Sequence, residues 1–136
     1  MSDAIRNVTH VDPTLDTQGW WDALSRDEVT MPTCALCDAR FFPPQAHCPT
    51  CGSADWRCQQ TDGVGRLYSW VVIHRAFSPE VADKVPYAIV AVDLDDGGRI
   101  VGRFLHDPVG LHDGMALKAQ VFRENGDPLL GFKSQT

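Results

Sequence analysis

The sequence predicts a mostly β protein in three consecutive parts: a short N-terminal helix, a four-cysteine module and a five-stranded barrel. Three observations lead to this prediction. A short amphipathic stretch carries two adjacent tryptophans, four cysteines follow as two close pairs, and the rest alternates β-rich runs with glycine-rich turns. A chain of 136 residues has room for a small module beside a larger one. We expect the boundaries 1–30, 31–57 and 58–136.

The first part is expected to be a flexible tail followed by a short docking helix. The tail is polar and ends in an Asp-Pro step. The stretch TQGWWDALSRDEV then places Trp20 and Leu24, with Trp21 beside them, on one helical face after an N-cap at Asp16 or Thr17. A helix of about ten residues is not stable alone. The tryptophans must therefore pack against the chain's own domain or against a partner, where tryptophan is enriched at interface hot spots.

The second part contains the spacing Cys34-x2-Cys37-x10-Cys48-x2-Cys51. Each pair can form a tight turn whose backbone amides point at the sulfurs, so two pairs bring four thiolates into a tetrahedron. Structural zinc sites are filled by four such ligands. Metal binding also supplies the folding energy that a module of under about 40 residues lacks. We predict one structural zinc per chain, with no role for the fifth cysteine, Cys58.

Other roles for the cysteines are less favoured. The N-terminus lacks a secretory signal and no apolar run is long enough to cross a membrane, so a cytoplasmic location is expected, where disulfides are rare. The stretch CPTCG resembles a rubredoxin knuckle, and iron would make the chain an electron carrier. However, the ten-residue gap is shorter than the rubredoxin pattern. A redox dithiol would not need two matched pairs.

The third part reads as short strands throughout. GVGRLYSWVVIHRAF is rich in β-branched and aromatic residues, and two further stretches carry hairpin turns at Asp95–Gly98 and Glu124–Asp127. Five or so strands without a long helix indicate a small barrel, and the OB-fold is the commonest of that size. The expected core comprises Val64, Leu67, Val71, Ile73, Ala88, Val90, Val92, Ile100, Phe104, Leu117, Val121 and Leu130.

The charge distribution argues against nucleic acid as a partner. The net charge is −6, with −4 over residues 1–30, zero over residues 31–57 and −2 over residues 58–136. Nucleic-acid binding draws most of its affinity from basic side chains that neutralise phosphates. A barrel of this kind can stack single-stranded bases on exposed aromatics, and Tyr68, Trp70 and Phe104 are candidates. We keep this as an alternative, although no basic groove supports it.

No catalytic set emerges from the motifs. The chain has no phosphate-cradling glycine loop and no Gly-x-Ser-x-Gly elbow, and a zinc with four cysteine ligands has no open position for chemistry. The acid–base pairs that could form are His74 with Asp93, His106 with Asp107, and His112 with Asp113. Such residues are more often solvated or hydrogen-bonded side chains. The residues alone therefore predict a non-catalytic binding or scaffolding protein.

The order of the motifs resembles a known family. An aromatic helix leads into C-x2-C-x-x-x-FFPP-x-x-x-CP-x-CGS, then G-x-G-x-LYSW-x-VIHR, then PYAIVAVDLDDG-x-RIVGR. Over roughly residues 15–133 this is similar to the bacterial and archaeal family that joins a rubredoxin-like zinc ribbon to an OB-fold and is called acyl-CoA-associated. One departure is Gln45, where the family often has arginine after Pro44.

The resemblance implies an accessory subunit in a hetero-oligomer. Family members accompany thiolase-superfamily thiolases and aldolases or MaoC-type enoyl-CoA hydratases, including enzymes of steroid or fatty-acid degradation, and the partner carries the catalytic residues. The subunit docks on that enzyme and helps to form or cover the acyl-CoA site. On this reading, CoA-phosphate contacts would come from Arg66, Arg75, Arg103 or the partner.

The aromatic residues of the first two parts are the candidates for the partner or acyl-CoA surface. A loop held between two metal-binding turns is preorganised, which lowers the cost of binding. The alternative is that these residues pack the ribbon onto the barrel. The expected surface consists of Trp20, Trp21, Phe41, Phe42, Pro43 and Pro44.

Overall fold

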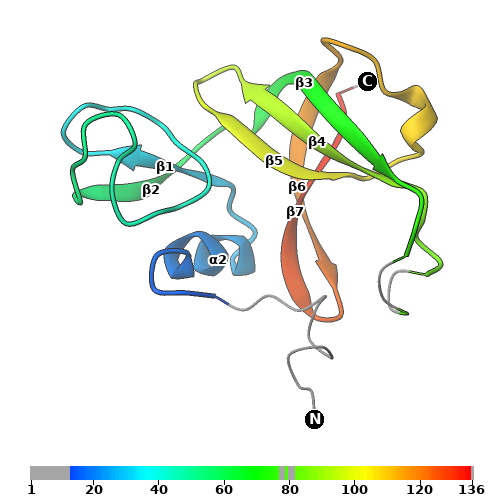
Figure 1. The fold of residues 1–136 in the computed structure, drawn as a ribbon, viewed down its shortest axis with the longest axis horizontal. Coiled ribbons are helices and arrows are strands. Elements are labelled where there is room, and N and C mark those ends of the chain that lie inside the picture. Colours follow the sequence, from blue (N-terminus) through cyan, green and yellow to red (C-terminus); the bar gives the residue numbers. More distant parts are fainter. Residues whose placement is uncertain (1–12, 77–78, 80–81, 136) are drawn as a thin grey trace.

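The computed structural model describes residues 13–76, 79 and 82–135. It confirms a mostly β fold with a short helix, a small ribbon and a five-stranded OB-like barrel (Figure 1). Most of the expected flexible tail, residues 1–12, lies outside the described part. The elements are α2 (Gln18–Ser25), β1 (Thr30–Cys34), β2 (Trp56–Gln60), β3 (Val64–Ile73), β4 (Tyr87–Leu94), β5 (Arg99–Phe104), the 3-10 helix η2 (Pro108–Gly110), β6 (Ala116–Glu124) and β7 (Asp127–Ser134).

The helix α2 has eight residues, with Thr17 as its N-cap, and lies beside both the ribbon and the barrel (Figure 1). Trp20 and Leu24 are buried, so this face of the helix packs against the chain's own core. Trp21, next along the chain, is only partly buried. No helix in the described residues is long and apolar enough to cross a membrane.

The barrel closes in the strand order β3-β4-β5-β7-β6, with a short parallel contact between β5 and β7 and antiparallel pairing elsewhere. Both predicted hairpins are present, between β4 and β5 and between β6 and β7. In the second turn Asn125 has φ 54° and Gly126 has φ 86°. Two successive left-handed residues suit a two-residue hairpin turn, which explains the Asn-Gly sequence there.

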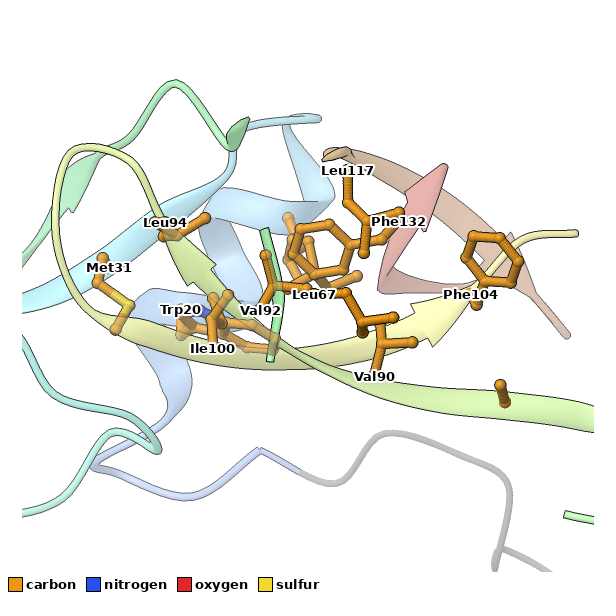
Figure 2. Close-up of a cluster of buried hydrophobic side chains, with 13 residues drawn as sticks. Trp20, Met31, Leu67, Val90, Val92, Leu94, Ile100, Phe104, Leu117 and Phe132 are labelled. Carbon is orange, nitrogen blue, oxygen red and sulfur yellow. The ribbon is translucent and has the colours of Figure 1, made fainter. Parts of the chain in front are cut away.

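One continuous apolar core fills the barrel and extends beyond it. The barrel contributes Leu67, Ala88, Val90, Val92, Leu94, Ile100, Phe104, Leu117, Leu130 and Phe132. Trp20 from α2 and Met31 from β1 join the same cluster (Figure 2). Leu24 from α2 also belongs to it. The helix and the ribbon are therefore anchored to the barrel by shared apolar packing.

The expectation that Val71 belongs to the core is wrong, because its side chain is 58% exposed. The register between β3 and β4 shifts between Leu67 and Ser69, which marks a β-bulge. An extra residue in a strand moves the following side chains to the opposite face. Val72 accordingly packs against the core in place of Val71.

Candidate metal centre and apolar groove

The four predicted ligands converge between the two ribbon strands and the loop that joins them. Cys34 ends β1, and the N–H groups of Leu36 and Cys37 donate to its Sγ at 3.4 and 3.5 Å. The second pair repeats this turn, with the N–H of Thr50 donating to Cys48 Sγ at 3.4 Å. Gly52 follows with φ 81°, a conformation that glycine adopts without strain. The local sequence thus builds two equivalent sulfur-binding turns.

The sulfur positions fit one metal ion. The four Sγ atoms all lie within 4.8 Å of one another, and none forms a disulfide. Cys34 and Cys51 Sγ are 3.6 Å apart, and Cys37 and Cys48 Sγ are 3.7 Å apart. A tetrahedral zinc with Zn–S bonds of about 2.3 Å requires sulfur–sulfur separations of about 3.8 Å. Cys34, Cys37, Cys48 and Cys51 therefore form a zinc-ribbon site for one ion.

The turns also prepare two of the thiols for ionisation. The N–H groups of Cys51 and Thr50 point at the sulfur of Cys48 and lower its pKa to about 6. The N–H of Cys37 acts in the same way on Cys34, whose pKa is also lowered. Metals bind the thiolate, so these amide contacts favour the ligand state. With four sulfurs in place no position is left for substrate, and the role of the metal is structural.

Two residues of the Phe-Phe-Pro-Pro loop are buried and the other two remain accessible. Phe41 is buried with Cys34 and Cys48 in the ribbon's own small core, and its ring meets the edge of Trp56 at 5.4 Å. Pro44 is also buried, whereas Pro43 is exposed. Phe42 is half-buried and points to α2, with its ring 5.5 Å from that of Trp20. Phe42 and Pro43 are therefore the loop residues that remain accessible.

An apolar groove lies where the loop, the helix and the barrel meet. It has a volume of about 310 Å³, and we call it the apolar groove. Trp21 packs edge-on against Trp20 at 4.7 Å and forms one wall with Phe42. The floor is the outer face of the barrel and consists of Ile89, Val101, Phe122 and Leu129. The sequence analysis did not select these four residues. They could have been found as apolar side chains on the solvent side of strands whose other face is core.

A fixed cation borders the apolar groove. Arg103 donates from Nη1 and Nη2 to the two oxygens of Glu124, at 2.8 and 3.0 Å. Lys84 Nζ donates to the same carboxylate at 2.7 Å. The Arg103 guanidinium also lies over the rings of Tyr87 and Phe122, at 4.9 and 5.2 Å. These contacts hold the charge in place, and they lower the pKa of the buried Glu124 to about 2, chiefly through the Arg103 hydrogen bonds.

The other predicted phosphate contacts lie elsewhere. Arg66 is exposed near the start of β3, and Arg75 is exposed just beyond its end. Arg103 lies on β5, opposite Ile89 of β4. The three arginines therefore do not form one cluster.

The predicted acid–base pairs find other partners. Asp93 pairs with Arg99 at 2.6 Å near the end of the β3–β4 ladder opposite to that of His74. The ring of His106 packs on Phe104, while Asp107 accepts from the N–H of Val109 and caps η2. His112 contacts the carbonyl of Gly110. Asp93, His106, Asp107 and His112 thus each contact a group other than the partner considered from the sequence.

Comparison with known proteins adds two family models that together span the ribbon and most of the barrel. The model for the ChsH2 rubredoxin-like zinc ribbon domain matches residues 21–57, and the model for the ChsH2 C-terminal OB-fold domain matches residues 59–122. Both descriptions agree with the parts that the structure shows, including the cysteine cluster.

Two relatives carry informative names. The chain is 31% identical over 99 residues to a DUF35 domain-containing scaffold protein of Methanocaldococcus jannaschii, covering 69% of each chain. It is 35% identical over 86 residues to a probable enoyl-CoA hydratase alpha subunit of Thermomonospora curvata. That match covers 63% of this chain but only 26% of the hydratase subunit, so the chain spans about a quarter of that relative.

Two solved structures share the architecture. A chain of an Ltp2-ChsH2(DUF35) aldolase superimposes with a TM-score of 0.82 at 26% identity, covering 93% of this chain and 100% of that one. A DUF35 protein of unknown function from Sulfolobus solfataricus superimposes with a TM-score of 0.59 at 13% identity, covering 98% and 95%. The second match supports the fold alone.

Proposed function

Because the chain belongs to the DUF35 family of ChsH2-type zinc-ribbon and OB-fold proteins, we propose that it is a non-catalytic subunit of an acyl-CoA-processing enzyme. It docks on a catalytic partner and helps to form or cover the acyl-CoA site. The relatives named as scaffold proteins agree with a non-catalytic role. The candidate partners are a thiolase-superfamily thiolase or aldolase and a MaoC-type hydratase, in line with the aldolase and hydratase names among the similar proteins.

The apolar groove is the observation that carries this proposal. Trp21 and Phe42 form its wall while remaining only partly buried, and Val101 on its floor is 41% exposed. Side chains of this kind usually become buried in a complex. Phe42 is held by a loop that the metal fixes, so little conformational freedom is lost when it binds. The docking surface that we propose consists of Trp21, Phe42 and Pro43, with Trp20, Phe41 and Pro44 supporting it from inside.

The same groove suits the acyl portion of a thioester. Its volume of about 310 Å³ is at the lower end of small-molecule sites, and its lining is apolar apart from Arg103. Arg103 has N–H groups beyond the two that Glu124 accepts, and its charge lies where the groove opens to polar surface. We assign Arg103 to the polar end of the acyl-CoA. Arg66 and Arg75 lie near opposite ends of β3, so we assign the remaining phosphates to the partner.

Two other functions fit the structure less well. A single-stranded nucleic-acid site needs free aromatic faces in a basic groove. Tyr68 is instead covered by the Arg99 guanidinium at 3.4 Å, and that charge is balanced by Asp93. An electron carrier would need iron at the four cysteines, whereas the matching family model is described as a zinc ribbon. A red colour with stoichiometric iron would reveal an electron carrier.

The test is the affinity for the catalytic partner, which is sought first among any enzymes encoded near this chain's gene. Trp21→Ala and Phe42→Ala should each weaken the complex by about 2 kcal/mol, which is about 30-fold in Kd, because truncating an anchor at an interface centre typically has this effect. Zinc content should not change. Leu36→Ala and Val109→Ala are matched controls, because these side chains are 75% and 88% exposed away from the apolar groove. Parent-like affinity in both test variants would place the interface elsewhere.

A further inference from the structure

The strand β2 is an open edge, unlike every strand of the barrel. It pairs with β1 alone, in a two-stranded antiparallel sheet, whereas the five barrel strands close on themselves. An edge strand presents unpaired N–H and C=O groups to its surroundings, and proteins usually protect such an edge. The exposed edge of β2 is therefore a feature that the proposed function has not used.

The hydrogen bonds of β1 show which groups of β2 are free. The carbonyl of Pro32 accepts from the N–H of Phe41 at 3.1 Å, so Pro32 points its backbone groups away from β2. Pro32 lies opposite Cys58. In an antiparallel ladder, residues opposite each other either bond to one another or both point outward. The N–H and C=O of Cys58 therefore point to the open side.

The same argument applies at each second residue along the strand. The N–H of Cys34 donates to the carbonyl of Ala39 at 2.9 Å, away from β2. Trp56 lies opposite Cys34, so the backbone N–H and C=O of Trp56 also point to the open side. Gln60 follows with the same two-residue period. Within residues 13–76, 79 and 82–135, no hydrogen bond reaches the N–H or C=O of these three residues from the open side.

The strand carries little that would protect this edge. The sequence WRCQQ contains no proline and no lysine, and its one charged side chain is the exposed Arg57, which lies opposite Thr33. Beside it lies a groove of about 580 Å³ between β2 and the helix, which we call the β2 groove. Gly19 and Ala23 present small side chains on the helix side, and no atom lies within 4 Å of the position that a Cβ on Gly19 would occupy. Room is therefore available next to the strand.

We propose that β2 accepts an extended segment of the partner enzyme as a third strand of the ribbon sheet. Donors and acceptors repeated every second residue, about 6.6 Å apart, are complementary to another extended polypeptide backbone. Side chains of the incoming strand that alternate toward the helix enter the β2 groove. The inference rests on the proposed function, because it requires a protein partner, and it adds a second contact on a different face from the apolar groove.

A second copy of this chain is the competing occupant. Two β2 edges could pair with each other, but each copy carries a net charge of −6, which opposes self-association. A concentration-dependent dimer that Cys58→Pro abolishes would replace the partner strand with a second copy and overturn the proposal.

Amide hydrogen exchange tests the proposal directly. It is read at single residues in the zinc-loaded chain with and without the catalytic partner of the proposed function. The amides of Cys58 and Gln60 have no acceptor among the residues that the structure describes and should exchange at least about 10-fold more slowly in the complex. The amide of Gln59 faces β1 by the same alternation and serves as the internal control. Unchanged exchange at Cys58 and Gln60 in a complex that forms would overturn the third strand and leave the proposed function intact.

Variants give an independent test. Cys58→Pro removes the outward N–H without touching the β1 ladder, and proline is tolerated on edge strands. It should weaken the complex at least about 5-fold with zinc retained, whereas Cys58→Val, which keeps the N–H, should bind like the parent. Gly19→Leu fills the β2 groove and should also weaken binding. Parent-like binding by Cys58→Pro would contradict the proposal, and failure of any complex to form would remove the proposed function as well.

Discussion

The ribbon and the barrel reach a stable structure by different means. The ribbon has five paired positions between two strands and a buried cluster of only Cys34, Phe41 and Cys48. The barrel closes five strands around a large core in which Ala88, Val90, Val92, Ile100, Leu117 and Phe132 are 0% exposed. A module that buries so little apolar surface cannot offset its conformational entropy by packing alone. Metal coordination therefore supplies in the ribbon the stabilisation that apolar burial supplies in the barrel.

Removing one zinc ligand should have the largest effect, because it should unfold the ribbon and leave the barrel folded. Cys37→Ser leaves three thiolates, and structural zinc contributes about 10 kcal/mol or more to the folding of small zinc modules. We expect loss of the metal and unfolding of the ribbon, while the barrel keeps its β circular dichroism signal. Elemental analysis and circular dichroism measure the two effects.

Cys58→Ser is the matched control for this experiment, since Cys58 lies outside the four-sulfur cluster. It should retain one zinc per chain. Stoichiometric zinc in Cys37→Ser, or loss of zinc in Cys58→Ser, would contradict the assignment of the ligands.

Truncating a side chain in the barrel core should lower the stability of the fold without loss of zinc. Phe132 is fully buried, and Phe132→Ala should lower the free energy of unfolding by about 3–5 kcal/mol through lost burial and a cavity. Zinc should remain bound wherever the chain is folded. Urea unfolding gives the magnitude, and Val109→Ala, at an 88% exposed position, should change it by less than about 0.5 kcal/mol. An equally small change in the free energy of unfolding in both variants would mean that Phe132 does not stabilise the core.

The buried ion pair of the barrel gives a pH-dependent contribution. The pKa of Glu124 is lowered from 4.5 to about 2, mainly by hydrogen bonds from Arg103 and then Lys84. A lowered pKa contributes stability that is complete above the unfolded value and is lost as the pH falls through the folded value. The contribution, on the order of 3 kcal/mol, should therefore disappear between about pH 4.5 and pH 2.

The measurement is the difference in unfolding free energy between the parent and Glu124→Gln at each pH. Comparing the two chains removes the loss that both share when acid releases zinc. The difference should shrink as the pH falls from 4.5 toward 2. Val109→Ala, which alters an uncharged side chain that is 88% exposed, should show no such trend. A difference that stays constant with pH would mean that the carboxylate charge of Glu124 does not stabilise the fold.

Local patterns made much of this molecule predictable. The two Cys-x-x-Cys pairs determine their own turns, because the amides that bind each sulfur come from the next two or three residues. The hairpins were equally local, since Asn125 and Gly126 supply the left-handed backbone that the turn requires. Periodicity also gave most of the core, since alternate residues of β4 are buried.

Features that depend on contacts distant in sequence were not predictable. The bulge in β3 turns Val71 from the expected core face to the solvent, and no residue type in that stretch indicates a bulge. The pairing of Arg103 with Glu124 was not predictable either, because Glu124 lies 21 residues later and only the closure of the barrel brings it within reach. The division of the Phe-Phe-Pro-Pro loop is similar: Phe41 and Phe42 are neighbours, but one faces the metal site and the other faces the helix.

The smallest expected effect concerns the junction between the two regions. Asp96, in the turn between β4 and β5, accepts from Arg40 of the ribbon at 3.0 Å and from the hydroxyl of Thr61 at 2.8 Å. The N–H of Asp62 donates to the same carboxylate at 3.2 Å. One side chain thus ties the cysteine loop and the connection after β2 to the barrel.

Asp96→Ala should lower the free energy of unfolding by only about 1–2 kcal/mol, because these bonds lie near the surface, where water replaces part of what is lost. Its effect on amide exchange should differ more clearly between the ribbon and the barrel than its effect on overall stability suggests. Arg40 keeps its bond to the Gly97 carbonyl at 3.1 Å but loses its ion pair, and Thr61 and Asp62 lose their acceptor. The amides of β1 and β2 should therefore exchange faster, while those of β4 and β5 keep the protection that the barrel ladder gives them. Asp95→Ala, at the exposed neighbouring position, should leave both sets unchanged. If exchange rises equally in the ribbon and the barrel, the two regions unfold as one unit, and the zinc-held and core-held parts are not separable.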